Sequence, residues 1–476
     1  MKWHQKFFWL LLALLPTQLG LHFWPEWAGV LGRRVDYLAP TLFLTDLLVF
    51  LTTGCWLASV FFQGAQGNTK SQILSQRLIS LWLTNPKQIP RFKIPKLQTK
   101  HVWLAAVLAF VGINIFIATN IPVAVYKWIK VCEYILLGLY IVRTKPKLSF
   151  VITPLAVGVL YSSILAITQF FLQHSVGGPL WWLGERTFGV DTPGIARYDF
   201  DFRLSTFDFR LFGLRPYATF PHPNVLGGFL AAVLPLLCMS LMRPMSLMSP
   251  MNQRIKYLHA TALVLGAIAL LLTFSRSAIV VGGAGIGISI LYLVFRKKMN
   301  RVFAYILYTI PFILFLVLAV WSFSPKEESV VVRQQLNNAA IKLWTASPLF
   351  GVGLGNFLVR LPEALPSRTI YFLQPVHNIY LLVLAETGVV GFVFIVIFIW
   401  QSIKGLVFRI KENRKELLFN LNTIYFVPFF CILLLGLVDH YPLTLQQGQL
   451  LLTVLVGMSI VVLQSNKVTN RRIEVQ

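Results

Sequence analysis

The chain has 476 residues, of which 56% are hydrophobic and only 12% are charged, and its mean hydropathy is +0.69. A soluble protein cannot hide so much apolar side chain, which excludes a soluble enzyme or binding domain and indicates a protein that crosses a membrane many times. The net charge of +25 suggests a nucleic-acid partner. The basic residues, however, cluster in short loops between apolar runs, as the positive-inside rule predicts for a membrane protein.

Apolar segments of spanning length predict about twelve transmembrane helices, in one polytopic membrane domain of residues 1–476. The N-terminus resembles a signal peptide, but it has no clear cleavage site, so we expect an uncleaved first helix. The predicted spans lie near 7–23, 38–62, 103–120, 122–142, 149–172, 224–242, 258–275, 277–295, 302–322, 378–400, 418–438 and 446–464.

One orientation places the basic clusters on a single side of the membrane. If the N-terminus is cytoplasmic, the basic loops face inward, and so does the C-terminal tail with Lys467 and Arg471. Two segments, 173–223 and 323–377, then face outward and are too long to be simple turns. Because long ordered loops are usually functional, we expect these two structured extracytoplasmic segments to hold the chemistry.

The first outer segment contains a local duplication, FDFRL at 200–204 and again at 207–211. Its alternation with period two suggests strands. The intervening Ser205-Thr206 is a poor hairpin turn, and a segment at the membrane interface with its Phe residues in lipid fits equally well. Asp199 and Asp201 in this segment form a DxD pair that can hold Mg²⁺ or Mn²⁺. Other hard ligands nearby are few, so a solvated edge is favoured and no metal site is predicted.

The second outer segment contains VVVRQQLNNAAIKLW at 330–344, whose apolar residues recur at helical spacing. We predict an amphipathic helix on the membrane surface, with Arg333 as a candidate substrate ligand. SPLFGVGLGNF at 347–357 is expected to form a glycine-rich turn. GVGLG at 351–355 and GGAGIG at 282–287 resemble nucleotide-binding loops, but neither lies between a strand and a helix of a soluble domain, so no nucleotide is expected.

Two arginines lie next to predicted spans on the outer side. Arg215 precedes the span at 224–242, in RPYATFPHPN, and Arg276 lies between two apolar runs with almost no loop. An arginine at membrane depth is costly and tends to face the protein interior with a partner, although near the interface it can also reach the lipid headgroups. Guanidinium groups bind phosphate bidentately and keep their charge, which favours a lipid-linked phosphate or diphosphate. His222 and Asn224 flank Pro223 and are candidate ligands at the same place.

The stretch PVHNIYLLVLAETGVVG at 375–391 places His377 at the outer end of a predicted span. An imidazole there can take or orient a proton near neutral pH. Asn378 can cap the helix or hold a sugar. Glu386 points away from His377 on a straight helix, and we expect it to bond a neighbouring helix or line the far side of a cavity.

A last outer turn, GLVDHYPLTLQQGQ at 436–449, contributes Asp439 and His440. These two side chains either line the same cavity or form a structural hydrogen bond.

Taken in order, Arg215 with TFPHPN, SRSA at 275–278, SPLFGVGLGNF and HNIYLLVLAETGVVG make the chain similar to the O-antigen ligase / O-antigen polymerase superfamily. The resemblance covers roughly residues 150–460. It implies an all-α membrane fold of the glycosyltransferase C type, in the inner (cytoplasmic) membrane with its active site outside. It further implies that Arg215, Arg276 and His377 are essential.

The reaction that the resemblance implies transfers a glycan from an undecaprenyl-diphosphate carrier to an acceptor hydroxyl, with inversion, without metal and without any cofactor. The expected partners are the carrier-linked donor, a glycan, lipid or protein acceptor, and the bilayer. The position of His222 often holds a small residue in this family.

A polymerase that joins carrier-linked repeat units is the alternative within the class. A transporter or flippase is the alternative from another class, although no repeat relates the two halves of the chain.

Overall fold

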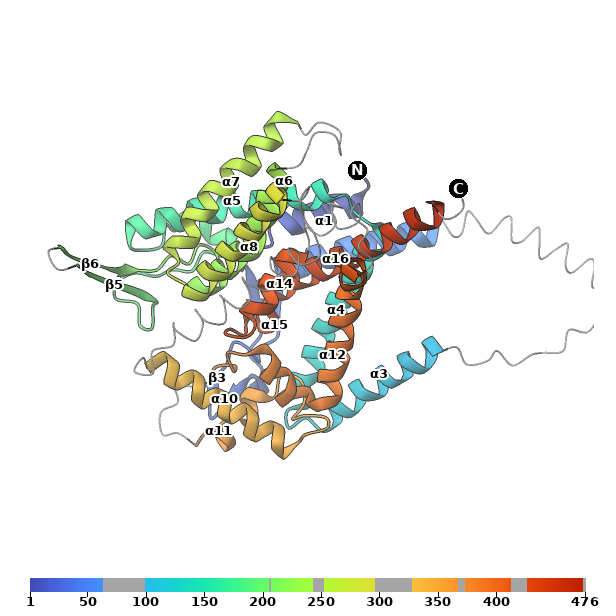
Figure 1. Cartoon of the computed structure of the whole chain (residues 1–476). Helices are drawn as coiled ribbons and strands as arrows, with labels where there is room; N and C mark the ends of the chain where they lie inside the picture. Colours follow the sequence, from blue (N-terminus) through green and yellow to red (C-terminus); the bar gives the residue numbers. More distant parts are fainter. Residues whose placement is uncertain are drawn as a thin grey trace, which may run out of the picture.

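The computed structural model describes residues 1–62, 99–204, 207–242, 252–295, 328–366, 373–411 and 426–473. Within these ranges the chain is mostly helical, and its strands form three two-stranded antiparallel sheets. Figure 1 shows the start of the N-terminal helix and the end of the C-terminal helix on the side of the molecule away from the β5–β6 hairpin.

The N-terminal region differs from the predicted first span at 7–23. Helix α1 covers only Trp3–Ala13, and the chain then turns and enters β1, Gly20–His22. Proline disfavours helical backbone in the residue before it, and Pro16 therefore ends the helix early. Strand β1 pairs with β4, Thr41–Phe43, while the short 3₁₀ helix η1, Glu26–Ala28, leads into the small β2–β3 sheet of Gly29–Val30 and Arg33–Arg34.

Most other predicted spans correspond to helices. The helix Leu44–Phe62 is followed, among the described residues, by α3 Thr99–Phe116, α4 Ile121–Thr144, α5 Leu148–Leu172, α6 Pro223–Leu241, α7 Gln253–Leu272, α8 Arg276–Phe295, α12 Ile379–Lys411, α14 Phe426–Leu435 and α16 Gln446–Ile473. Five of these described helices are long and apolar enough to cross a membrane by themselves: Leu44–Phe62, α5, α6, α7 and the Ile379–Gln401 part of α12. The membrane class is therefore supported. The predicted span at 302–322 lies outside the described residues, and the total of about twelve stays a prediction.

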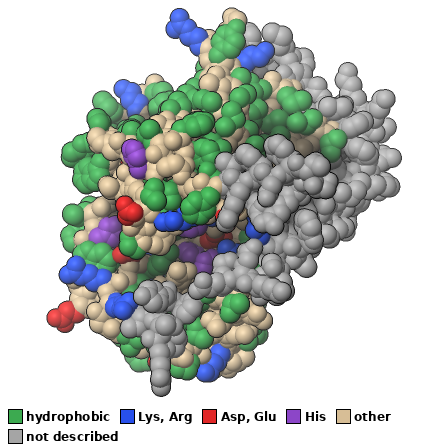
Figure 2. All heavy atoms as spheres, turned by 90° about the vertical axis from the view of Figure 1, so that its left-hand side faces the viewer, with side chains coloured by type: hydrophobic (Ala, Val, Ile, Leu, Met, Phe, Trp, Pro, Cys, Tyr) green, Lys and Arg blue, Asp and Glu red, His purple; other side chains and the backbone are tan. Residues whose placement is uncertain are grey.

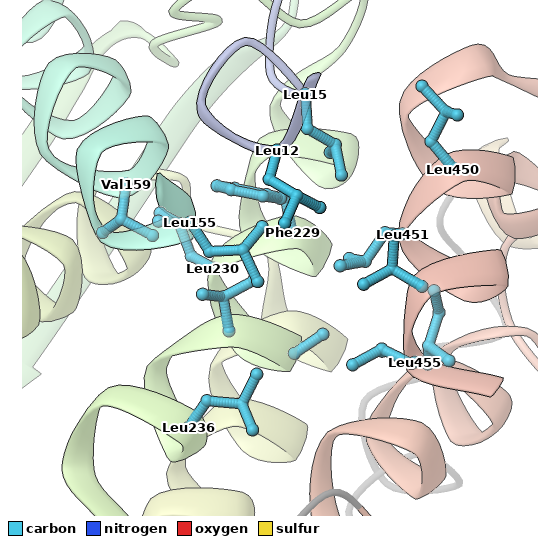
Figure 3. Packing of buried hydrophobic residues seen from close by; sticks show 14 of the residues in the cluster. Leu12, Leu15, Leu155, Val159, Phe229, Leu230, Leu236, Leu450, Leu451 and Leu455 are labelled. Carbon is cyan, nitrogen blue, oxygen red and sulfur yellow. The ribbon is translucent and has the colours of Figure 1, made fainter. Parts of the chain in front are cut away.

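Helix α6 is the centre of the bundle. Of its apolar span, 89% is buried, against 28% for α7, which lies at the periphery. Figure 3 shows Phe229, Leu230 and Leu236 of α6 packed among leucines from α1, α5 and α16. A helix that is apolar on all sides belongs in such a position, because no face of it needs water. This packing fixes the N-terminus of α6, at Pro223, in the middle of the protein.

The first outer segment folds as a hairpin. After the 3₁₀ helix η2, Gly178–Leu183, strand β5, Arg197–Leu204, pairs with β6, Phe207–Leu214, from Arg197 opposite Leu214 to Leu204 opposite Phe207. The strand alternative is therefore the correct one for the duplicated FDFRL. Asp201 of the DxD pair lies opposite Arg210 across the hairpin, while Ser205 and Thr206 are outside the described residues. In Figure 1 this hairpin projects from the helical body.

The second outer segment contains the predicted amphipathic helix, α10, Glu328–Ala346, followed by α11, Phe357–Ala364. The expected position of α10 on a membrane surface stays a prediction, but its apolar face is covered by protein. It packs into a second core with α11, the start of α12 and the loop around Val30 and Val35, and its members there are Leu336, Ala339, Ala340 and Leu343. The protein itself offers enough apolar surface to cover this face.

Helix α12 is interrupted at Gly388, whose backbone is non-helical at φ 64° and ψ −170°. The glycine-rich segment fills the interruption. The amides of Val352 and Gly353 donate to the carbonyls of Ala385 and Glu386 at 2.9 and 3.0 Å. On the other side of the break, the amides of Val389 and Val390 donate to Pro348 and Leu349 at 2.8 and 3.1 Å. The main-chain groups that a broken helix would leave unpaired are thus satisfied by residues 348–353.

Candidate functional site

The site begins with Arg215, directly after β6. Its Nε donates to the carbonyl oxygen of Thr273 at 2.6 Å, and one terminal nitrogen donates to Oδ1 of Asn224 at 2.7 Å. Burial lowers the pKa of this guanidinium to about 10, and the positive charges of Arg333 and Arg276 act in the same direction. A group with that pKa stays protonated at neutral pH. Arg215 is therefore a fixed positive charge, oriented from both sides.

The loop that carries Arg215 is held by a side chain that sequence reasoning missed. Oε1 of Gln169, in α5, accepts from the amides of Tyr217 and Ala218 at 3.0 and 2.7 Å. Its amide nitrogen donates to Oε1 of the buried Glu185 at 2.8 Å, and Glu185 in turn accepts from the amides of Val176 and Gly177. A glutamine inside a span was the available signal, since a polar side chain there needs partners.

The start of α6 contributes His222 and Asn224. Nδ1 of His222 accepts from the amide of Asn224 at 3.1 Å, so His222 caps the helix. Burial lowers the pKa of His222 to about 4, with the charge of Arg215 as the next cause, and the ring is neutral at neutral pH. Because Nδ1 is an acceptor, the proton of the neutral ring sits on Nε2, which is a donor.

Two glycines let the first turns of α6 approach the neighbouring elements. A Cβ on Gly228 would overlap the hydroxyl of Tyr441, in the short helix α15, Tyr441–Thr444. A Cβ on Gly227 would lie 2.9 Å from Cβ of Ala278, near the start of α8. Gly227 and Gly228 thus bring the turns that carry Arg276 and Asp439 close to Asn224.

Asp439 and His440 occupy the turn between α14 and α15. Asp439 is 8% exposed, and its carboxylate accepts from the amide of His440 at 2.8 Å and from Nδ2 of Asn224 at 3.5 Å. Nδ1 of His440 lies 2.6 Å from the Thr444 hydroxyl. Burial opposes the charge of Asp439, but its neighbours His440, His377 and Arg333 favour the carboxylate, and together they lower its pKa. Asn224 therefore bridges a guanidinium and a carboxylate.

His377 lies just before α12, with its ring 5.0 Å from that of His440 in an edge-to-face arrangement. Its Nδ1 is buried and has no hydrogen-bond partner among the described residues. Burial lowers the pKa of His377 to about 3, partly opposed by the negative charge of Asp439. The ring is neutral at neutral pH and has a lone pair that can accept a proton.

Arg276 and Arg333 complete the group of charges. Arg276 is the first residue of α8, after a tight turn in which Phe274, at φ 49°, stacks on Tyr198 of β5 with 4.4 Å between ring centres. Arg333 lies on α10, within electrostatic reach of Arg215, His222, His377 and Asp439. The described residues of the site thus carry three guanidinium charges against the single carboxylate of Asp439. Such a site attracts an anion with more than one negative charge.

Two further predicted site residues make structural contacts. Oδ1 of Asn378 accepts from the amides of Tyr380 and Leu381 at 2.9 and 3.1 Å, so Asn378 caps α12. Glu386 accepts from the amide of Phe357 at 3.2 Å and so bonds the start of the neighbouring helix α11, as one of the two expectations had it. Asn114, in α3, donates to the carbonyls of Phe350 and Glu386 and was not found from the sequence. Glu386 and Asn114 therefore hold the glycine-rich segment in place.

Figure 2 shows histidine, acidic and basic side chains gathered in a recess of the face toward which the hairpin projects. The contacts above join the turn after β6, the mouth of α6, the α7–α8 turn, the turn before α12 and the α14–α15 turn. The fold and this arrangement define a class: a membrane protein with a recess that gathers arginine and histidine side chains at one end of its helices.

Residues 261–396 match the family model described as O-antigen ligase. This match confirms the O-antigen ligase / O-antigen polymerase superfamily that the motifs indicate, and it supports a function of the ligase or polymerase type. It includes Arg276, Arg333 and His377, whereas Arg215, Asn224 and Asp439 lie outside it. Comparisons with curated proteins and with solved structures gave no match.

Proposed function

We propose that this protein transfers a glycan from an undecaprenyl-diphosphate carrier to an acceptor hydroxyl at the outer face of the cytoplasmic membrane. The observation that carries the proposal is that Arg215 lies within electrostatic reach of Arg276 and Arg333, and that Arg333 also reaches a neutral histidine, His377. Guanidinium groups are suited to a diphosphate, and the recess opens at one end of the helices, where a lipid headgroup lies. The anion and the proton acceptor then share one site.

The donor diphosphate is held by the three guanidinium groups. Arg215 is oriented by Thr273 and Asn224 before any ligand binds, so little ordering is needed on binding. As the bond between the anomeric carbon and the diphosphate oxygen breaks, negative charge grows on that oxygen. Fixed positive groups stabilise growing charge more than they stabilise the ground state, which lowers the barrier.

His377 takes the proton of the acceptor. The acceptor hydroxyl oxygen attacks the anomeric carbon, a new glycosidic bond forms, and the electrons of the broken bond leave with undecaprenyl diphosphate. The hydroxyl proton moves to the neutral imidazole, and Asp439, within electrostatic reach, stabilises the imidazolium that forms. A single displacement from the side opposite the leaving group inverts the anomeric carbon.

Replacing His377 tests the proton step. His377→Gln keeps a polar side chain but cannot accept a proton, so we expect turnover to fall by about 10²–10⁴-fold. Binding of a carrier-linked glycan should be unchanged, because the arginines remain. The measurement is turnover and donor binding in reconstituted vesicles, and the matched control is His174→Ala, an exposed histidine outside the site. Wild-type turnover in His377→Gln would remove this residue from the mechanism.

Product size separates a ligase from a polymerase. Purified carrier-linked glycan is supplied alone or with a candidate glycan, lipid or protein acceptor. A ligase gives one product, the acceptor plus one donor glycan, whereas a polymerase gives a ladder from the carrier-linked glycan alone. We expect transfer to the added acceptor.

A transporter is the alternative from another class, and transporters often have broken helices. The break in α12 does not favour this alternative, because residues 348–353 already occupy the main-chain groups that would bind an ion or solute. Uptake of carrier or glycan without a covalent product would support a transporter and contradict the proposal.

A further inference from the structure

A second group of charged side chains is buried in the bundle, apart from the arginine site. Lys130, in α4, lies with its Nζ 2.6 Å from Oδ1 of Asp46 and 2.7 Å from Oε2 of Glu133. Asp46 is in the first turn of the helix Leu44–Phe62, and Glu133 is one turn along α4 from Lys130. The three residues are 2–7% exposed, so they are almost completely removed from solvent.

The charges of this cluster do not balance. Two carboxylates share one ammonium group, which leaves one net negative charge if all three are ionised. The next basic residue along α4, Lys127, faces Glu386 of α12 as an opposite charge and so has its own partner. An uncompensated buried charge is expensive, and within a membrane protein it marks a site that binds something.

The geometry of Glu133 shows where the missing positive charge belongs. Its Oε2 accepts from Lys130, but its Oε1 is buried and has no hydrogen-bond partner among the described residues. The carboxyl groups of Glu133 and Asp46 lie close together, because one oxygen of each is within 2.7 Å of the same ammonium nitrogen. Two ionised carboxylates cannot use that proximity, because neither has a hydrogen to donate, whereas one added proton makes a hydrogen bond between them.

We propose that Asp46 and Glu133 form a proton-binding site, in which the two carboxyl groups hold one proton between them and share the ammonium group of Lys130. With that proton the cluster is electrically neutral. The proposal is independent of the reaction performed at Arg215 and His377.

The remaining neighbours favour the proton on Glu133 and the negative charge on Asp46. Asp46 accepts from Lys130, from the amide of Phe43 at 3.0 Å and from the side-chain amide of Gln446 in α16. Glu133 has only Lys130 as a donor within the part of the chain that the structure describes. The phenols that face the cluster are Tyr126 and Tyr134, and Tyr134 lies 2.6 and 2.8 Å from Oε1 of Gln446 and of Gln449, so its hydroxyl is already engaged. The carboxylate with more donors holds the charge better.

Infrared difference spectroscopy tests the site directly. At neutral pH the wild-type protein, purified in detergent, should show the carbonyl-stretching band of a buried protonated carboxyl group, shifted when H₂O is replaced by D₂O. Glu133→Gln should lose this band. Glu363→Gln is the matched control, because Glu363 also pairs with a basic residue three positions away, Arg360, but is exposed at the surface.

Stability gives a second, independent readout. Glutamine has nearly the shape of protonated glutamic acid, so Glu133→Gln should melt within a few degrees of wild type at neutral pH. Failure of Glu133→Gln to fold would contradict the proposal, because it would mean that the ionised carboxylate is needed. A wild-type spectrum without the band, or a band that sodium abolishes and choline restores, would also overturn it, the latter by showing that a metal cation takes the place of the proton.

Discussion

Asn224 has the most consequential contacts at the scale of single residues. It joins Arg215 to Asp439, and its own amide is capped by His222. In the sequence, Asn224 is the second residue of a Pro-Asn pair at the start of a predicted span. Nothing there shows whether its side chain binds substrate or bridges two other side chains. The structure assigns it the bridge, which makes it a positioning residue for the proposed donor site.

Replacing Asn224 should therefore weaken the proposed donor site without unfolding the protein. In Asn224→Ala, the Arg215 guanidinium loses a hydrogen bond, and a bond to a charged group contributes about 1.5–3 kcal/mol. We expect the specificity constant for carrier-linked glycan to fall by about 10–150-fold, since 1.4 kcal/mol is tenfold. The control is Asn338→Ala, an exposed asparagine on α10. Unchanged kinetics in Asn224→Ala would show that Arg215 does not need this bridge.

At the scale of elements, hydrophobic periodicity predicted where helices lie, and helix boundaries agree for α4, α5 and α6 within a residue or two. This agreement has a physical cause, since a span must satisfy its main chain internally and its length follows from the bilayer. The prediction of the first span was wrong because Pro16 ends the helix early, although the apolar run continues. Apolar periodicity predicted a buried face on α10, but it does not specify whether lipid or protein covers that face.

The candidate site was predicted in part for a similar reason. Arginines beside spans are costly enough to signal a role, and the structure brings Arg215, Arg276, Arg333, His377 and Asp439 together. The side chains of Gln169 and Asn114 form hydrogen bonds with main-chain groups more than forty residues away in sequence. No local sequence pattern predicts such contacts. The cluster of Lys130 and Glu133 was detectable, because two charges inside an apolar run are rarely without function.

The interrupted helix α12 yields a prediction at the element scale. Gly388 has a backbone conformation open essentially only to glycine, and a Cβ there would overlap the main chain of Leu349. Gly388→Ala should lower the free energy of unfolding by at least about 1–3 kcal/mol. Thermal unfolding in detergent measures the loss. Gly283→Ala in α8, where a Cβ meets nothing within 4 Å, is the matched control and should be neutral or stabilising. Equal melting of wild type and Gly388→Ala would contradict the role of the break.

At the scale of the whole molecule, folding places neutral histidines where water cannot solvate a charge. The pKa of His222 is lowered to about 4 and that of His377 to about 3, in each case first by burial. The unfolded chain binds protons at these rings below about pH 6.5, whereas the folded protein does not. The unfolded state therefore gains free energy from protonation as the pH falls.

The stabilisation that these two rings contribute should accordingly be lost between about pH 6.5 and about pH 4. The folded-state pKa values are depressed histidine values, so the stabilisation is complete above the unfolded pKa and is lost as the pH falls toward the folded pKa. Each ring contributes up to about 1.4 kcal/mol per pH unit. Melting temperatures across this range measure the effect, and His377→Gln should reduce the slope by about one proton. The same pH dependence of melting in wild type and His377→Gln would show that the ring of His377 is not buried as described.

The join between residues 348–353 and the two halves of α12 is made by backbone atoms, four amide-to-carbonyl bonds in all. Backbone hydrogen bonds of this kind fix the number of residues in the segment, but they leave the identity of most of its residues open. Homologous chains should then keep glycine at positions 351 and 353, where a Cβ would overlap neighbouring atoms, and should tolerate no insertion or deletion between Pro348 and Gly353. The length of this segment, more than the identity of most of its residues, is what evolution would have to preserve.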